Sequence, residues 1–129
     1  METDGGGIRR RSVSQGPRQK PLKPHWFQIL LALADHDLHG LGIMEEVSAR
    51  TEGVVHLWPG MLYGSLKQML DMGFVVETDP PEDAQPGGGK PRYYGITAAG
   101  REELVREIRR LSTYLDAARA KNVLQGGDA

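Results

Sequence analysis

Four polar side chains within residues 58–74 have types and spacings that suit contacts with a nucleic acid. They are Tyr63, Ser65, Lys67 and Gln68. In a helix, Tyr63 and Lys67 share a face, where a phenol hydroxyl and an ammonium group can bind phosphate oxygens. Ser65 and Gln68 can add neutral hydrogen bonds, and Gln68 has the groups that read an adenine edge. The competing interpretation of Tyr63 is a half-buried ring that orients the helix.

The apolar residues of the same segment predict the helix that positions these groups. Leu62, Leu66, Met69 and Leu70 recur at helical spacing and can point into a core. The outer face holds Gly64 between the polar residues and is therefore slim. A helix that lies close to a nucleic-acid groove needs such a narrow surface.

Two other groups of cations are candidates for contact with the DNA backbone. Lys90 and Arg92 flank the point where a turn-rich segment rejoins a predicted strand, although ordinary solvated charge would look the same. Arg9, Arg10 and Arg11 lie near the N-terminus, where the first 23 residues carry six cations against two acidic residues. This basic segment can be an arm that contacts DNA or a solubilising tail.

The balance of charge limits how tightly the rest of the chain can hold DNA. The formal net charge is −1, which argues against a uniformly basic DNA-coating protein. Between residues 56 and 94, three cations stand against five acidic residues. Because backbone affinity rises with the number of phosphates neutralised, we expect the N-terminal arm to supply much of the nonspecific attraction.

The residues expected of an enzyme or a metal centre are missing or wrongly spaced. The chain has no cysteine, and its four histidines form no His-Glu-x-x-His motif. The glycine run before Lys90 lacks two residues that a phosphate-binding loop requires, because Ala84 and Pro91 stand in their places. We therefore expect no enzyme, no cofactor and no metal site.

The chain also lacks the apolar segments of a membrane or secreted protein. No apolar run approaches the length of a membrane span, and no hydrophobic signal core follows the N-terminal arginines. We expect a soluble cytoplasmic protein.

Periodicity and turn residues predict four helices and one hairpin. The helices are expected over about 24–34, 40–53, 59–73 and 97–124. The strands are expected over 74–78 and 92–96, joined by a long tip rich in proline and glycine. Residues 54–57 are a connection or a small strand.

Four apolar residues form a stripe along the last helix. Leu104, Ile108, Leu111 and Leu115 follow one another at spacings of four, three and four residues. This heptad-like stripe needs an apolar partner surface, and a second copy of the chain is the simplest one. Packing against the chain's own first helix is the alternative, and both can hold.

Together these elements predict a mainly α fold with a small β-hairpin. The arrangement is a winged helix-turn-helix with a C-terminal dimerisation helix. We expect a disordered basic arm over residues 1–21, a DNA-binding domain over 22–97, the dimerisation helix over 98–124 and a disordered tail over 125–129.

Five short motifs, in this order and at this spacing, resemble those of the PadR family of bacterial transcriptional regulators. They are Ile29-Leu30-Leu31-Ala32-Leu33, Leu38-His39-Gly40, Pro59-Gly60-Met61-Leu62-Tyr63 with Leu66, Gly73-Phe74-Val75, and Arg92-Tyr93-Tyr94-Gly95-Ile96-Thr97-Ala98-Ala99-Gly100. The resemblance spans roughly residues 22–115. Each motif is weak alone, but the ordered set is fairly specific.

The resemblance implies a homodimeric transcription repressor that binds an inverted-repeat operator in double-stranded DNA. It implies that the third helix enters the major groove and that the wing touches the adjacent backbone. Many members of the family lose DNA affinity when a small aromatic or drug-like effector binds near the dimer interface. Trp26 and Trp58 are the only tryptophans, and a core role is the default for both. Trp26 could instead line such a pocket against the last helix of a second protomer. By the same analogy Tyr94, rather than Tyr93, points inward.

The chain departs from the family pattern at three positions. Met61 stands where threonine is usual, Leu41 where an aromatic residue follows His-Gly, and Gly64 where a larger residue is common. The loss of a hydroxyl at residue 61 removes one potential contact with DNA. Gly64 weakens the helix by about 1 kcal/mol relative to alanine.

Two other interpretations remain open. The acidic balance of the folded part and the weakly charged third helix suit a winged-helix module that binds protein rather than DNA. A MarR-like regulator is the weaker rival within DNA binding, because that family commonly places its wing between more helices.

Overall fold

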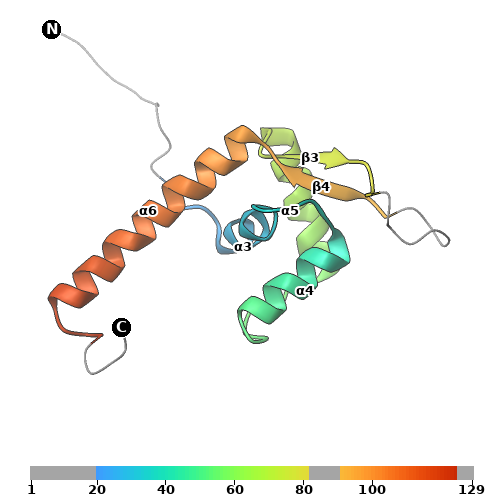
Figure 1. Cartoon of the computed structure of the whole chain (residues 1–129). Helices are drawn as coiled ribbons and strands as arrows, with labels where there is room; N and C mark the ends of the chain where they lie inside the picture. Colours follow the sequence, from blue (N-terminus) through green and yellow to red (C-terminus); the bar gives the residue numbers. More distant parts are fainter. Residues whose placement is uncertain (1–19, 82–90, 125–129) are drawn as a thin grey trace, which may run out of the picture.

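The computed structural model of the chain describes residues 20–81 and 91–124. Four helices and three short strands follow one another in these two ranges. In chain order they are α3 (Pro24–Ala32), β2 (Leu38–His39), α4 (Gly40–Arg50), α5 (Pro59–Met72), β3 (Val75–Thr78), β4 (Tyr93–Ile96) and α6 (Ala98–Ala120). The mainly α fold with a small β-hairpin that the sequence predicts is confirmed (Figure 1).

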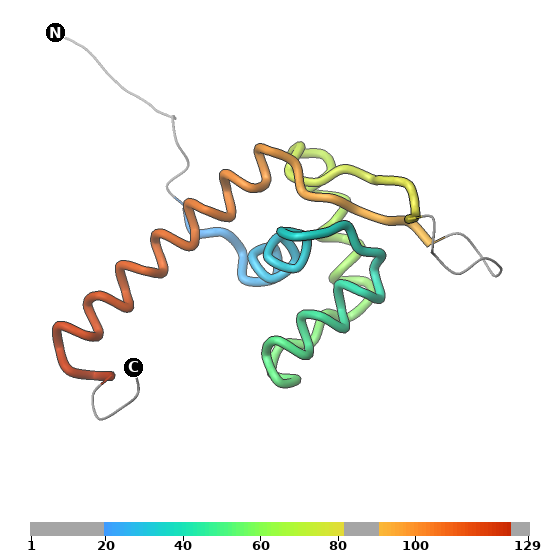
Figure 2. The backbone as a smooth tube through the Cα atoms, viewed as in Figure 1, coloured from blue at the N-terminus to red at the C-terminus, as the bar shows by residue number. Residues whose placement is uncertain are grey.

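The helices are arranged around α3. Figure 2 shows α3 between α6 on one side and the pair α4 and α5 on the other. The first half of α6 packs on this body, and its second half extends away from it (Figure 1). The hairpin of β3 and β4 lies at the opposite end of the structure from the C-terminal end of α6.

Residues with special backbone or capping properties set the helix boundaries. Pro24 lies in the first turn of α3, where its missing N–H costs no hydrogen bond. Gly53 and Gly73 follow α4 and α5 with a φ of +81°, a conformation that favours glycine. The Thr97 hydroxyl accepts a hydrogen bond from the Gly100 N–H (3.0 Å) at the start of α6. The helix boundaries predicted at Gly73 and Thr97 are therefore confirmed, whereas α4 ends at Arg50, three residues before Gly53.

The three strands form one antiparallel sheet in the order β2-β4-β3. β3 and β4 make the predicted hairpin, with Thr78 opposite Tyr93. The sequence does not predict β2, whose two residues pair with Tyr93 and Tyr94, because a strand this short has no alternation to detect. Residues 54–57, left open as a connection or a small strand, contain no strand.

One apolar cluster holds the helices and the hairpin together. Its buried members are Leu22, Trp26, Ile29, Leu30, Ala32, Leu33, Ile43, Val47, Leu57, Leu62, Leu66, Met69, Phe74, Val75, Tyr94 and Leu104. Each large aliphatic side chain in such a cluster contributes roughly 1.5–3 kcal/mol by its removal from water. Tyr94, which the family resemblance places inward, is 3% exposed.

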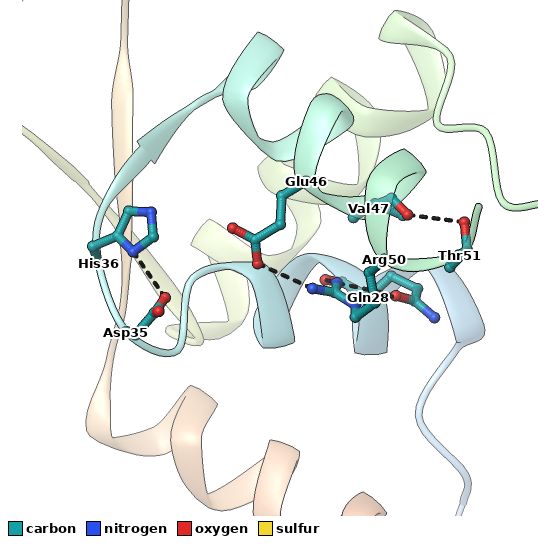
Figure 3. A network of polar contacts seen from close by, with 7 residues as sticks. All are labelled: Gln28, Asp35, His36, Glu46, Val47, Arg50 and Thr51. Atoms are coloured by element: carbon teal, nitrogen blue, oxygen red, sulfur yellow. Dashed lines mark hydrogen bonds and ion pairs between the residues drawn. The ribbon is translucent and has the colours of Figure 1, made fainter. Parts of the chain in front are cut away.

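A polar network joins α3 to α4 on the outside of this core (Figure 3). The Arg50 guanidinium donates to the backbone oxygen of Gln28 (3.1 Å) and to its side-chain oxygen. It also pairs with Glu46 one turn earlier (3.0 Å). The Thr51 hydroxyl donates to the Val47 carbonyl (2.8 Å) and closes the end of α4. These bonds tie α4 to the central helix.

The buried Glu107 joins the N-terminal segment to α6. Its carboxylate accepts a hydrogen bond from the Leu22 N–H (3.1 Å) and pairs with Arg110. The hydrogen bonds from Arg110 hold the pKa of Glu107 below its ordinary value, although burial acts in the opposite direction, and the Leu22 N–H adds to the lowering. Glu107 is therefore a charged, satisfied part of the protomer's interior.

Two negative findings concern the described residues only. No helix in residues 20–81 and 91–124 combines the length and the apolar character that a bilayer crossing needs. Across the same ranges, no three His, Asp or Glu side chains gather where they could hold a metal ion.

Candidate nucleic-acid interface

Helix α5 presents a buried side and an open side. Its fully buried residues are Leu62, Leu66 and Met69. Its open side includes Gly60, Gly64, Lys67, Gln68 and Asp71. Tyr63 is 47% exposed, and Ser65 is partly buried. Of the four polar residues that the sequence selects, Tyr63, Lys67 and Gln68 are therefore well placed for an external partner, and Ser65 is less accessible.

Two glycines one turn apart make the open side of α5 narrow. A Cβ atom added at Gly60 or at Gly64 would have no other atom within 4 Å. Each glycine in a helix costs about 0.5–1 kcal/mol relative to alanine. The protomer's own packing does not require either glycine, so the narrow surface is a property that only an external partner could use.

Tyr63 connects α5 to the start of α4. A Cβ atom added at Gly40 would lie 2.1 Å from the Tyr63 hydroxyl oxygen, so the tyrosine occupies the space that this glycine leaves open. The ring is thereby held in one direction while half of its surface stays exposed. The two interpretations of Tyr63 are compatible, because the hydroxyl end of the ring lies against Gly40 while 47% of the residue's surface stays exposed.

The predicted cation Arg92 lies at the loop end of the hairpin, one residue before β4. The exposed Arg92 guanidinium pairs with the Glu77 carboxylate across the two strands (3.5 Å). Burial, and then the Glu77 carboxylate, raises the pKa of the inward-facing Tyr94, so its hydroxyl remains protonated; Arg92 acts in the opposite direction. His39 stacks on Tyr93 with ring centres 5.2 Å apart, which braces the hairpin against β2. Arg92 thus stands on a rigid base, with its charge partly neutralised.

The remaining predicted cations fall outside the described residues. Lys90 lies between the two ranges, and Arg9, Arg10 and Arg11 precede the first. Within the described part of α5, Lys67 and Asp71 are the charged residues, so the helix itself carries no net charge. The shortage of positive charge that the sequence indicates is therefore also found on the open side of α5.

The apolar stripe of α6 divides into two parts. Leu104 is 3% exposed and belongs to the protomer's own core. Ile108, Leu111 and Leu115 are 42%, 36% and 48% exposed, although they continue the same side of the helix. The part of the stripe that is open to a second surface therefore begins at Ile108.

An apolar groove follows this open part of α6. Its volume is about 570 Å³, and Phe27 of α3 forms its other wall. The groove is lined by Phe27, Ile108, Leu111, Ser112, Tyr114 and Leu115. The Tyr114 hydroxyl accepts a hydrogen bond from Arg110 (2.7 Å) at its edge.

Trp26 has the core role that is its default. It is 7% exposed and meets Phe74 edge-on, with ring centres 6.4 Å apart. The Lys23 ammonium lies 4.9 Å from the centre of its ring. A hollow of about 170 Å³ adjoins Trp26, Lys23 and Met72, so a small space for a ligand exists beside this residue.

The default core role is wrong for the other tryptophan. Trp58 is 63% exposed, and its ring contact is with the edge of His56, at 5.2 Å between ring centres. It stands at the cap position before α5, so it does not belong to the apolar side of that helix. Met61, one turn into α5, is 36% exposed. Trp58 precedes Leu62 by four residues, so spacing alone would place it on the buried side of α5. The signal available in the sequence was its place before Pro59, outside the helix.

Solved structures with a similar fold include three regulators from bacteria. A transcriptional regulator from Clostridium thermocellum has a TM-score of 0.60 at 17% identity, over 74% of this chain and 86% of that chain. A PadR family transcription regulator from Clostridium difficile has a TM-score of 0.60 at 22% identity, over 74% of this chain and 94% of that chain. PadR from Bacillus subtilis, solved in complex with operator DNA, has a TM-score of 0.59 at 21% identity, over 69% of this chain and 48% of that chain. At these identities the likeness shows the fold.

A family comparison shows more than the fold. A search among curated protein sequences found no match. Residues 29–106, more than half of the chain, match the Transcriptional regulator PadR-like family. The matched range contains α4, α5, the hairpin and the first turns of α6, which are the elements of the candidate interface. The chain therefore belongs to the PadR-like family of transcriptional regulators.

Proposed function

We propose that this protein regulates transcription by binding a specific DNA operator as a homodimer. The observation that carries the proposal is the open side of α5, which is narrow, exposed and polar in a chain of the PadR-like family. A helix of this kind fits the width of the major groove, where the donor and acceptor pattern of each base pair is distinct. The hairpin then reaches the adjacent backbone.

The proposed contacts divide between phosphates and bases. Tyr63 and Lys67 bind phosphate oxygens from one edge of α5, and Arg92 and Lys90 bind them from the hairpin. Gln68 reads a base edge, with Ser65 as a lesser contributor because it is partly buried. Arg92 exchanges its surface partner Glu77 for a phosphate, which costs little because both groups are well exposed.

Dimerisation uses the open part of α6. Ile108, Leu111 and Leu115 offer an apolar surface that a second copy of the same helix can cover, while Leu104 keeps the helix anchored in its own protomer. A dimer with two-fold symmetry presents two copies of α5 to the duplex, so its operator is an inverted repeat. The half-site spacing then equals about one helical turn of DNA, or a multiple of it.

The N-terminal basic arm and a small-molecule effector have further roles in the proposed function. Arg9, Arg10 and Arg11 add the positive charge that α5 lacks, so they supply much of the salt-sensitive attraction. The mode of regulation is repression, relieved by a small aromatic effector that binds near Trp26 and the dimer interface. The hollow beside Trp26 and the family resemblance support this part.

Selection of bound duplexes from a random pool, followed by footprinting, tests the proposed function. The full-length chain is expected to enrich an inverted repeat and to protect two half-sites symmetrically. Tyr63→Ala combined with Lys67→Ala should abolish the enrichment without a change in far-UV circular dichroism. A folded wild-type protein that enriches no sequence would instead support the protein-binding winged-helix module.

A further inference from the structure

The N-terminal tip of α5 carries apolar side chains that the protomer does not bury. Trp58 precedes the helix and is 63% exposed, and Met61 follows three residues later and is 36% exposed. Trp58 is the extended cap residue and Met61 lies in the first turn, so both exposed side chains stand at the N-terminal end of α5, and together they are called the apolar edge. Gly60 lies between them in sequence and adds no side chain of its own.

No packing role inside the protomer accounts for this edge. The Trp58 indole meets the exposed His56 ring and stays outside the apolar cluster. Its side chain makes no capping hydrogen bond to the first turn of α5. Large exposed apolar residues that gather at one place mark a surface that another molecule covers.

The position of the edge indicates which molecule covers it. In helix-turn-helix proteins the N-terminal residues of the recognition helix reach the base edges, and Trp58 and Met61 are at that end of α5. The major groove offers one prominent apolar group, the 5-methyl group of thymine. A methionine thioether or an indole can contact this methyl group, whereas neither matches the acceptors of guanine as arginine does.

The charges of α5 also favour apolar contacts with the bases. The charges of Lys67 and Asp71 give α5 no net charge. Contacts with phosphates also carry no direct sequence information, so the helix needs other contacts to prefer one sequence. Apolar contacts at base edges are a source of specificity that needs no charge. We infer that Trp58 and Met61 form a reading edge that recognises thymine methyl groups in the operator; this inference depends on the proposed DNA-binding function.

The test removes single methyl groups from DNA. The operator is obtained by selection with the full-length chain, and each thymine of a half-site is replaced in turn by deoxyuridine, which lacks only the 5-methyl group. Fluorescence anisotropy gives Kd for the wild type, Trp58→Ala and Met61→Ala. Val123→Ala is the matched control, because Val123 is a 65% exposed apolar residue beyond the end of α6.

The expected result is a coupling between one methyl group and one side chain. In the wild type, deoxyuridine at a contacted position weakens binding about fourfold, the value of one buried methyl group. In the variant that lacks the contacting side chain, the same replacement has no further effect. The Val123→Ala protein behaves as the wild type at every position.

Two results would overturn the inference, and they differ in what else they overturn. Specific binding with equal deoxyuridine effects in the wild type and both variants would reject the reading edge and leave the proposed function intact. It would point to a protein partner for the exposed tryptophan. A failure of the wild type to select any sequence would reject both proposals together.

Discussion

The open side of α5 and the open part of α6 are two exposed helix faces of very different chemistry. On α5, Gly60 and Gly64 alternate with polar residues, and the backbone lies close to the surface. On α6, Ile108, Leu111 and Leu115 expose branched aliphatic side chains that line an apolar groove. A wet, polar groove of a duplex suits the first face, and a second copy of an apolar helix suits the second.

Exposure alone does not separate these two faces. Tyr63 on α5 and Leu115 on α6 are 47% and 48% exposed, so the fraction of surface left open is nearly the same. The difference lies in what an exposed group can bind. A phenol edge beside glycines favours hydrogen-bonded contact at short range, whereas leucines gain free energy only when another apolar surface excludes water from them.

The largest expected effect follows from a charge on the apolar face of α6. Leu111→Asp should convert the dimer to a monomer, and operator affinity should fall at least about 100-fold because the two half-sites are no longer bound together. Light scattering coupled to gel filtration measures the first effect, and anisotropy measures the second. Thr113→Asp, on the opposite side of the helix, is the control and should remain dimeric. A dimeric Leu111→Asp protein would reject the assigned face.

A smaller effect is expected on the narrow face of α5. Lys67→Gln should weaken DNA binding similarly for all sequences, and it should reduce the slope of log K against log salt by about 1 for each protomer. Titrations with DNA at salt concentrations from about 50 to about 300 mM, where the binding constant depends steeply on salt, provide the measurement. Lys121→Gln makes the same charge change at the end of α6 and should leave the slope unchanged. If the slope of log K against log salt is the same for both variants, Lys67 does not contact the DNA.

Substitution of Gly64 should move stability and DNA binding in opposite directions. Gly64→Ala should raise the free energy of unfolding by about 0.5–1 kcal/mol, since nothing in the protomer opposes the added Cβ atom. The same change should weaken operator binding several-fold, and Gly64→Leu should weaken it further. Urea unfolding and anisotropy on the same preparations provide both values. Affinity that rises together with stability would show that the narrow surface serves no partner.

The smallest expected effect is on the pH dependence of stability, through Glu107, which joins α6 to the N-terminal segment. The pKa of Glu107 is lowered in the folded state, so the stability it contributes is fully present above its ordinary pKa and is lost as pH falls through the lowered value. Glu107→Gln should therefore be less stable than the wild type at neutral pH, and the difference between their free energies of unfolding should shrink as the pH falls through the lowered pKa of Glu107. Urea unfolding at several pH values measures the gap. A gap that does not change with pH would contradict the paired carboxylate.

Local patterns predict much of the fold. The spacing of Leu62, Leu66 and Met69 identifies the buried side of α5, and Gly73 and Thr97 mark two helix ends. These features depend on residues close together in the chain, so a single sequence contains the information.

Other features depend on tertiary contacts that no local pattern encodes. β2 exists because two residues meet the distant β4. Leu104 and Ile108 follow the same spacing, yet only Leu104 is covered, because the protomer's core packs over Leu104 and leaves Ile108 open. Tyr63 is oriented by Gly40, which lies on another helix. The exposed Trp58 could have been anticipated from its place before α5, but the default core role of tryptophan hid it.

The central claim, that the open side of α5 faces DNA, can be tested by photo-crosslinking. A benzoylphenylalanine at position 68, on α5, is compared with one at position 113, on the far side of α6, in the full-length dimer bound to the selected operator. Crosslinks to DNA are expected from position 68 within a half-site and none are expected from position 113. Crosslinks that are absent from position 68, in a complex that still binds the operator, would contradict it.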